Sequence, residues 1–189
     1  SAASVYIITV GTPLGPNGEA RLDMIAKATE QISGHIQDGA LVVLRSTVRI
    51  GTARAVVKPI LDKTGKRYEI AVCPERTLEG NAIAELTGLP QIIGADNSET
   101  LYRASQLFSA LTPTTVQVGS LETAECIKLV DNSYRDLTFA FGNEVARLCD
   151  AIGINAKEVI DRGKLGYART NVASPGPVGG PCLSKDPHI

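Results

Sequence analysis

The stretch Leu41-Val42-Val43-Leu44 is an unbroken apolar run, and the polar segment Arg45-Ser46-Thr47 follows it directly. A continuous apolar run is typical of a strand buried on both faces, as in a parallel sheet with helices on either side. Helical patterns flank this run at residues 21–36 and 52–63, although Pro59 is expected to bend the second helix or to end it early. The order predicts a buried strand between two helices that cover a sheet.

The same alternation continues through the first 120 residues. Short β-branched runs predict further strands at residues 5–10, 69–72, 91–93 and 115–118, and a further helix at residues 99–110. No Gly-x-Gly-x-x-Gly follows an early strand, so the dinucleotide-binding first half of a Rossmann fold is not found here. We therefore expect an α/β fold in which residues 1–120 form the second half of a doubly wound, Rossmann-like parallel sheet.

The character of the sequence changes after residue 120. Residues 122–152 predict one helix of roughly 45 Å, at 1.5 Å per residue. Gly153 is expected to end this helix, and Asn155 is expected to cap a short helix that continues through Arg162. We expect residues 121–189 to form an all-α central domain.

The long predicted helix carries apolar residues on several faces, namely Phe139, Phe141, Val145, Leu148 and Ile152. A helix that is apolar on more than one face is usually buried on more than one side, and two-fold dimers commonly supply the second cover. We predict a homodimer through residues 122–152. The alternative is that the short helix after Asn155 folds back over the exposed side.

The composition limits the class of protein. The 189 residues have a formal net charge of −1, so the chain lacks the charge of a nucleic-acid-binding protein, and its apolar runs are too short to span a bilayer. Four cysteines without C-x-x-C spacing and two histidines argue against a structural zinc site and against a disulfide framework. We expect no metal, no nucleic-acid or membrane partner, and a reducing, cytoplasmic location.

One cysteine lies in an unusual setting, the segment Gly179-Gly180-Pro181-Cys182-Leu183-Ser184-Lys185-Asp186. Glycines, a proline, a cation and a carboxylate make a poor core strand or helix. A nearby lysine, or amide groups freed by a turn, can lower the pKa of a thiol toward neutrality, and the thiolate is the form that attacks. The segment indicates a working cysteine, whereas the alternative is a buried structural cysteine.

A polar stripe is expected on the long helix, where Lys128, Asn132 and Arg135 advance by four and then three residues and so share one face. A lysine and an asparagine side by side can donate hydrogen bonds to an oxyanion, as acyl chemistry at a thiol requires. The alternative is a solvated stripe on an amphipathic helix.

The cysteine segment, with Ser174-Pro175-Gly176-Pro177-Val178 before it, resembles the Gly-Gly-x-Cys-[Phe/Leu]-[Pro/Ser]-Lys-Asp signature of the UDP-glucose/GDP-mannose dehydrogenase family, the nucleotide-sugar 6-dehydrogenases. Other segments resemble family motifs in family order, namely Gly11-Thr12-Pro13 (with Gly11 in place of the family's first Pro), residues 45–52, residues 73–80, and Glu125-x-x-Lys128 with Asn132 behind it. Residues 131–136, Asp-Asn-Ser-Tyr-Arg-Asp, and Arg76 are similar to the branch that acts on N-acetylated UDP-hexosamines, such as UDP-N-acetylmannosamine.

The resemblance implies roles for the residues that carry it. Cys182 would be the catalytic thiol, Lys128 and Asn132 would stabilise the oxyanions, and Asp186 would help to hold the hydrolytic water and to orient the thiol.

Two more catalytic roles are implied at strand ends. Thr47 would hold the catalytic water, and Glu75 would be the general base for thioester hydrolysis. Without the family, Ser46-Thr47 would be a helix-capping pair, and Glu75 and Glu79 would be exposed carboxylates at a helix start. The NAD cofactor would contact Thr12, Pro13, Ser46, Glu79 and Lys185, and the UDP-sugar would contact Arg135 and Leu78.

The implied reaction is the four-electron oxidation of a sugar C6 alcohol to a carboxylate for polysaccharide biosynthesis, with two NAD⁺ and one water, through a thiohemiacetal and a thioester on Cys182. The family's Gly-rich cofactor segment and UDP-binding domain are not found in residues 1–189, so we expect a fragment that is inactive alone. Two alternatives stay open. One is a two-electron dehydrogenase of the 6-phosphogluconate or 3-hydroxyacid type, which needs no thiol. The other is a non-catalytic core or dimerisation module.

Overall fold

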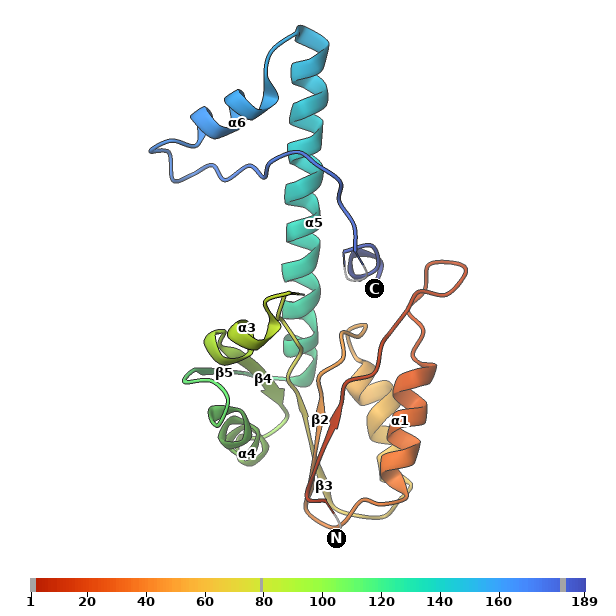
Figure 1. Cartoon of the computed structure of the whole chain (residues 1–189). Coiled ribbons are helices and arrows are strands. Elements are labelled where there is room, and N and C mark those ends of the chain that lie inside the picture. The colour runs from red at the N-terminus through yellow and green to blue at the C-terminus, as the bar shows by residue number, and fades with distance from the viewer. Residues whose placement is uncertain (1–2, 79, 181–182) are drawn as a thin grey trace. The chain divides into compact units, whose positions relative to one another are not determined.

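The computed structural model describes residues 3–78, 80–180 and 183–189, and these residues alternate strands with helices (Figure 1). The elements are β1 (Val5–Ile8), α1 (Asp23–Ser33), β2 (Ala40–Leu44), the π-helical turn η1 (Ala53–Val57), α2 (Lys58–Asp62), β3 (Tyr68–Val72), α3 (Ala82–Gly88), β4 (Gln91–Ala95), α4 (Ser98–Ser109), β5 (Thr115–Val118), α5 (Leu121–Ile152), α6 (Ala156–Gly163) and the 3₁₀ turn η2 (Asp186–His188). All five predicted strands and the predicted helices are present, and the Rossmann-like α/β class is confirmed.

The five strands form one sheet in the order β1-β2-β3-β4-β5. The pairs β1–β2, β2–β3 and β4–β5 are parallel, as predicted, but β4 runs antiparallel to β3 and pairs with it at Ala71↔Ala95 and Val72↔Gly94. The reason lies in the connection between them. Its helix α3, which the sequence analysis did not predict, has no buried residue and therefore does not cover the sheet as a parallel crossover would.

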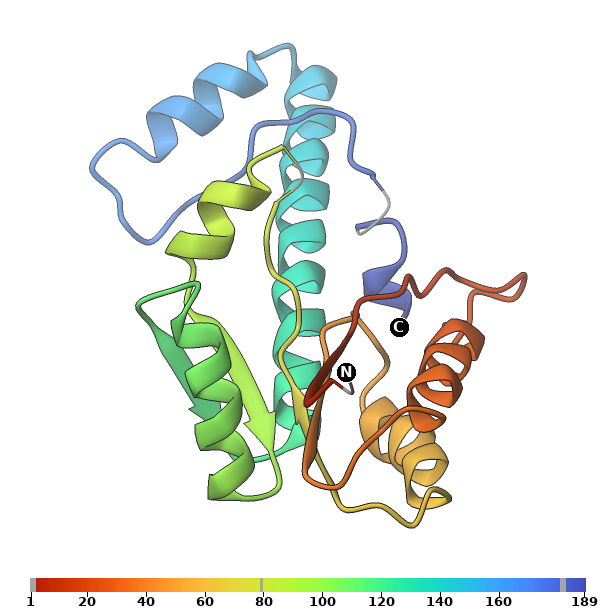
Figure 2. The ribbon, with the colours of Figure 1, turned by 60° about the horizontal axis from the view of Figure 1, so that its bottom comes forward.

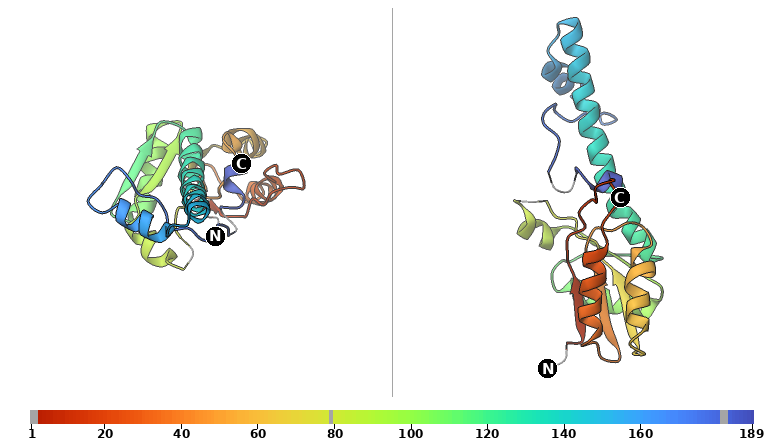
Figure 3. Two further views of the ribbon diagram at one scale, coloured as in Figure 1. Left: turned by 90° about the horizontal axis from the view of Figure 1, so that it is seen from above. Right: turned by 90° about the vertical axis from the view of Figure 1, so that its right-hand side faces the viewer.

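Apolar side chains of the sheet pack into a core on each of its faces. On β2, Val42 and Leu44 face a core shared with α1, η1, α2 and the start of α5, whereas Leu41 and Val43 face a core shared with α4. All four side chains are fully buried. Figures 1 and 2 show α1 and α4 on opposite sides of the sheet, and Figure 3 shows α1 and α2 side by side. The unbroken apolar run is thus a strand covered on both faces, as predicted.

The predicted helix at residues 52–63 forms as two pieces that meet between Val57 and Lys58, just before Pro59. Proline has no N–H to donate back to the residue four positions earlier. The segment before it takes a π-helical form, in which the backbone N–H of Lys58 donates to the carbonyl oxygen of Ala53. Pro59 then lies in the first turn of α2, where its missing N–H costs little.

A glycine in β4 lets the start of α5 approach the sheet closely. A Cβ placed on Gly94 would lie 2.2 Å from the carbonyl oxygen of Ser120 and 2.8 Å from the Cβ of Ala124. Any larger residue would push α5 away from the strand. This contact fixes the first turn of α5, which carries the charged residues described below.

The long helix ends as the sequence predicts. Gly153 follows α5 with a φ of +73°, the left-handed conformation that favours glycine, and the Asn155 side chain accepts a hydrogen bond from the Glu158 backbone N–H at 3.1 Å to cap α6. The chain forms two compact units, one running to Leu129 with the last two residues and the other running from Val130 to Pro187. None of the helices in the described ranges is long and apolar enough to cross a membrane.

Candidate active site

The loops that follow β1 and β2 are bonded to each other at the carboxyl ends of these strands. The Thr12 hydroxyl donates to the carbonyl oxygen of Thr47 at 2.5 Å, and the Ser46 hydroxyl donates to the carbonyl oxygen of Val10 at 2.6 Å. Thr12 and Ser46 are buried, whereas Pro13 is exposed. Open α/β sheets bind their ligands outside the carboxyl ends of strands. The structure therefore brings three of the predicted cofactor residues to an edge that suits a nucleotide.

Glu75 is held by an arginine that the sequence analysis did not assign to the site. Arg45, at the carboxyl end of β2, has a side chain that is 7% exposed and forms an ion pair with Glu75. It also donates to Gln91 at 3.0 Å and to the Cys73 thiol at 3.3 Å, and it lies 4.9 Å from the centroid of the Phe108 ring. A charged residue directly after four buried apolar positions was the available signal for this role, because such a charge needs a partner.

The carboxylate of Glu75 also organises its own loop, since it accepts the backbone N–H groups of Arg76 at 2.8 Å and Thr77 at 2.9 Å. Burial alone would raise the pKa of Glu75, but the hydrogen bonds from Arg45 and Thr77 hold this pKa below its usual value. Glu75 is therefore a stable anion. Its loop is not helical, so Glu75 is not the carboxylate at a helix start that the alternative predicts. Burial raises the pKa of the neighbouring Cys73 thiol to about 12, so this thiol is a poor nucleophile.

The rest of this loop is tied to α3. The backbone N–H of Leu78 donates to the carboxylate of Glu85 at 2.6 Å, and the Asn81 amide donates to the same carboxylate at 3.3 Å. The Leu78 side chain is 48% exposed, as a substrate contact would require. Glu79, predicted to contact the cofactor, lies outside the described residues.

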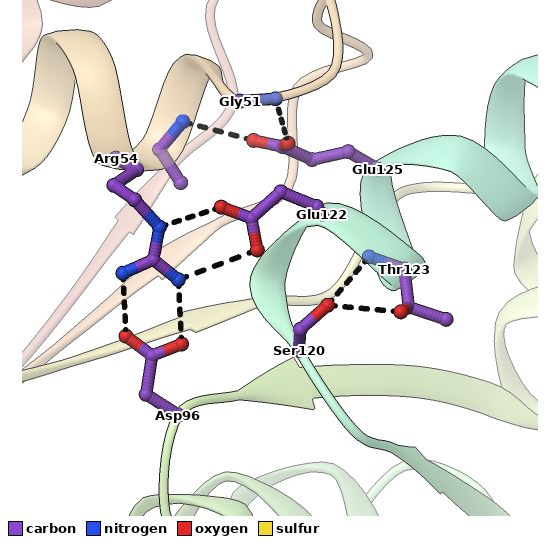
Figure 4. Close-up of polar contacts among 8 residues, drawn as sticks. Gly51, Arg54, Asp96, Ser120, Glu122, Thr123 and Glu125 are labelled. Carbon is purple, nitrogen blue, oxygen red and sulfur yellow. Dashed lines mark hydrogen bonds and ion pairs between the residues drawn. The ribbon is translucent and has the colours of Figure 1, made fainter.

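Two carboxylates in the first two turns of α5 reach back to the segment after β2 (Figure 4). Glu125 is 2% exposed and accepts the backbone N–H groups of Gly51 and Ala53. Glu122 accepts from Arg54, which also forms a bidentate pair with Asp96. From the sequence, Glu125 was predicted only as part of a motif. Its spacing from Lys128, one helical turn away, was the signal that it shares a face with that lysine.

Two members of the predicted polar stripe on α5 are buried. Lys128 is 8% exposed and Asn132 is 4% exposed, so the solvated alternative does not hold for them, whereas Arg135 is exposed. The Asn132 amide donates to the carboxylate of Asp186, which is 2% exposed and also forms an ion pair with Lys185. The structure thus joins three of the predicted site residues, Asn132, Lys185 and Asp186.

The segment that leads to the cysteine motif is fixed to the middle of α5. Asn143 donates from its amide to the carbonyl oxygen of Gly176 at 3.0 Å and accepts the Gly176 backbone N–H at 2.8 Å. One residue earlier, a Cβ on Gly142 would lie 2.4 Å from the carbonyl oxygen of Ala173. Glycine is a poor helix former, and the close approach of Ala173 explains why it stands inside α5. Cys182 itself lies outside the described residues.

Within residues 3–78, 80–180 and 183–189, no group of three or more histidine, cysteine, aspartate or glutamate side chains could hold a metal ion. The cysteines described there, Cys73, Cys126 and Cys149, are free thiols.

Comparison with protein families gives two adjoining matches. Residues 1–112 match the NAD binding domain of the UDP-glucose/GDP-mannose dehydrogenase family, and residues 122–189 match the central domain of the same family. Residues 113–121 lie between the two matches.

Individual relatives agree with these matches. The chain is 36% identical to a UDP-N-acetyl-D-mannosamine dehydrogenase of Methanocaldococcus jannaschii, over 98% of this chain and 44% of the relative. A UDP-D-ManNAc dehydrogenase structure from Pyrococcus horikoshii superposes with a TM-score of 0.92 at 31% identity, over 98% of this chain and 45% of that one. A UDP-glucose dehydrogenase structure from Pyrobaculum islandicum superposes with a TM-score of 0.91 at 27% identity, over 98% and 44%. The chain spans less than half the length of these relatives, and it belongs to the UDP-glucose/GDP-mannose dehydrogenase family.

Proposed function

We propose that this chain supplies part of an NAD-dependent nucleotide-sugar 6-dehydrogenase, which oxidises the C6 alcohol of a UDP-sugar to a carboxylate. The observation that carries the proposal is the buried contact between Asn132 and Asp186. It ties the end of the Gly-Gly-Pro-Cys-Leu-Ser-Lys-Asp segment to α5 within one compact unit of the chain, and both side chains are buried. A core module without chemistry would have little reason to bury these polar groups.

We propose a UDP-N-acetylhexosamine, such as UDP-N-acetylmannosamine, as the substrate. The sequence of residues 131–136 and Arg76 support this choice, and so do the names of the relatives from Methanocaldococcus jannaschii and Pyrococcus horikoshii. Arg135 is exposed on α5 and Leu78 is exposed in the loop after β3, so both side chains are accessible to a substrate.

The residues at the strand ends suit contact with a nucleotide, because Thr12 and Ser46 fix two loops there. When bound, NAD⁺ accepts the hydride in each of the two oxidations. Thr12, Pro13, Ser46, Glu79 and Lys185 are the residues that we expect to hold the cofactor. The chain's own groups would capture the aldehyde, stabilise the oxyanions and hydrolyse the thioester.

In this proposal Cys182 captures the aldehyde and later carries a thioester. Lys128 and Asn132 donate hydrogen bonds to the oxygen that becomes negative in each tetrahedral intermediate. Water then attacks the thioester carbonyl, the C–S bond breaks and the thiol is restored. Thr47 would hold this water and Asp186 would help to hold it.

Glu75 would accept the proton of the water in the hydrolysis step. Its lowered pKa makes it a weaker base than a free glutamate. Transfer of the proton therefore requires that the bond from Arg45 loosens when substrate binds.

We further propose a homodimer through α5. The exposed apolar side chains of this helix recur at intervals of three, four and seven residues, and they are Val130, Tyr134, Leu137, Phe141, Leu148 and Ile152. Such spacing forms one stripe along a helix and is typical of a helix–helix interface. We also propose a cytoplasmic location, since reducing surroundings keep a thiol nucleophile free. A part in polysaccharide biosynthesis completes the proposal.

The test is the stoichiometry of the reaction. The protein from the longest open reading frame that contains residues 1–189 is incubated with NAD⁺ and UDP-N-acetylmannosamine, and NADH and sugar acid are counted. Two NADH per acid are expected, whereas one NADH and no acid would favour the two-electron alternative. Absence of NADH with this sugar and with UDP-glucose would favour the non-catalytic alternative. Residues 1–189 alone are expected to give no NADH, because phosphate binding by a Gly-rich loop is not supplied by this segment.

A further inference from the structure

A buried carboxylate on α5 holds the loop that carries Thr47. Glu125 is 2% exposed, and its two oxygens accept the backbone N–H groups of Gly51 at 2.5 Å and Ala53 at 2.8 Å (Figure 4). Ala53 begins the helical segment after the loop, so its N–H has no acceptor within that helix. Glu125 supplies the acceptor from a different helix, and this fixes the loop to α5.

The other end of the same loop is fixed to the segment after β1. The Ser46 hydroxyl donates to Val10 and the carbonyl oxygen of Thr47 accepts from Thr12. Thr47 therefore lies between two attachments, one on the β1 side and one at Glu125. If either attachment were lost, the loop would be fixed at one end only and would no longer hold Thr47 in place.

Glu125 also lies three residues before Lys128, so one turn of α5 carries both side chains. The helix is held by its own backbone hydrogen bonds, whereas the loop depends on contacts with its neighbours. A change at Glu125 is thus expected to move the loop more than it moves Lys128.

A carboxylate suits this position better than an amide does. Both oxygens of a carboxylate accept hydrogen bonds, whereas a glutamine presents one acceptor and one NH₂ donor. With glutamine, one of the two backbone N–H groups would face another donor. The charged groups around Glu125 are Glu122 and Arg54, and these two side chains pair with each other rather than with Glu125.

We propose that Glu125 is a positioning residue for hydrolysis: through Gly51 and Ala53 it sets the place of Thr47 relative to Lys128. The inference rests on the proposed function, in which Thr47 holds the water that attacks the thioester on Cys182. A shift of about 1 Å in such a group can slow a step by about 10²-fold. Hydrolysis should therefore slow in a Glu125 variant, while the hydride transfers before it keep their rates.

The experiment compares Glu125→Gln with Glu122→Gln in the protein from the longest open reading frame that contains residues 1–189. Both variants remove one charge from the same part of α5, but Glu122 is a half-exposed partner of Arg54 with no contact to Gly51. NADH is followed from the first turnover with UDP-N-acetylmannosamine. The mass of the peptide that contains Cys182 is measured by mass spectrometry after the reaction is quenched with acid. Unfolding temperatures are measured for all three proteins.

For Glu125→Gln we expect a burst of two NADH per site, acid release about 10²-fold slower than in the unchanged protein, a trapped acyl group on Cys182 and a lower KM, because the acyl form of the protein accumulates. Glu122→Gln should behave as the unchanged protein does. If Glu125→Gln does not fold, Glu125→Asp carries the same test, because its carboxylate is one methylene short of the two N–H groups.

Two results would overturn the inference while leaving the proposed function intact. One is acid release at the unchanged rate, and the other is an equal slowing of hydride transfer and hydrolysis, which indicates a general structural role. If the unchanged protein forms neither NADH nor an acyl adduct with any nucleotide sugar, the proposed function and this inference fail together.

Discussion

Asn132 donates its amide hydrogen to the carboxylate of Asp186, which lies 54 residues further along the chain, and both side chains are buried. One residue belongs to a helix and the other begins a short 3₁₀ turn. The contact anchors the end of the cysteine segment to α5.

Asn132→Ala should destabilise the protein by about 1–3 kcal/mol, because a buried carboxylate then loses a hydrogen-bond donor. Urea unfolding measures this change. Asn171→Ala, which alters an exposed asparagine, is the control and should stay within about 0.5 kcal/mol of the unchanged protein. Equal stability of both variants would mean that the Asn132–Asp186 bond contributes nothing.

Gly142→Ala should destabilise the protein, although alanine is the better helix former. Its methyl group would meet the carbonyl oxygen of Ala173 at 2.4 Å, so the segment that leads to the cysteine must shift. Gly163→Ala, in α6, meets nothing within 4 Å and should be neutral or stabilising by up to about 1 kcal/mol. Thermal unfolding compares the two, and a gain in stability for Gly142→Ala would contradict the close approach.

The ion pair between Glu75 and Arg45 predicts a dependence on pH. The pKa of Glu75 is lower in the folded protein than its usual value of 4.5, so the stabilisation by the ionised Glu75 is present above about pH 4.5 and is lost as the pH falls through the folded pKa. Glu75→Gln should therefore be less stable than the unchanged protein at pH 7, with the difference shrinking toward pH 3. Urea unfolding at a series of pH values checks this. The Glu75 side chain is 41% exposed, so the difference should be about 1 kcal/mol or less.

Lys128→Ala should lower turnover by roughly 10²–10³ in the protein from the longest open reading frame, the usual loss when one oxyanion donor is removed. Cys182→Ser should abolish formation of the acid, because a hydroxyl lacks the nucleophilicity of a thiolate. Steady-state NADH production measures the loss in the Lys128→Ala variant, and analysis of the products measures acid formation by the Cys182→Ser variant. Normal acid formation by the serine variant would show that the Cys182 thiol does not carry the thioester.

Phe141→Glu should convert the proposed dimer into a monomer, because it places a charge in the exposed apolar stripe of α5. Light scattering at micromolar concentration measures the mass. Arg147→Glu changes an exposed residue of the same helix that is not in the stripe, and it should leave the dimer intact. Val145→Glu is a weaker test than the sequence suggests, since Val145 is half-buried in the structure. A monomer mass for the unchanged chain would refute the dimer.

Periodicity located most of the secondary structure because β2 and β4 are buried on both faces, α4 and α6 have asparagine caps, and a glycine follows α5. The run at residues 41–44 and the Asn155 cap are examples. The direction of β4 could not be predicted, since it depends on whether the connecting helix covers the sheet. The sequence pattern of residues 82–88 does not indicate whether this helix covers the sheet.

The site was predicted where a motif carried it and was missed where a residue acts on backbone groups far away in the sequence. Asn132 and Asp186 were both expected, and the structure joins them. Arg45, Glu125 and Asn143 were not assigned to the site, because their partners are carbonyl oxygens, N–H groups or side chains 28 to 74 positions distant. Spacing within one element reveals a shared face, but it does not reveal which loop packs against that face.

The antiparallel pairing of β3 with β4 has a consequence for how the sheet opens. This pairing joins two residue pairs, whereas each parallel pairing joins four or five. Fewer ladder hydrogen bonds give a boundary between cooperative units, so the amide hydrogens of residues 71–72 and 94–95 that bond across this pairing should exchange with solvent before those of β2. The sheet is thus a three-stranded unit and a two-stranded unit joined at a seam, and local unfolding should begin along that seam.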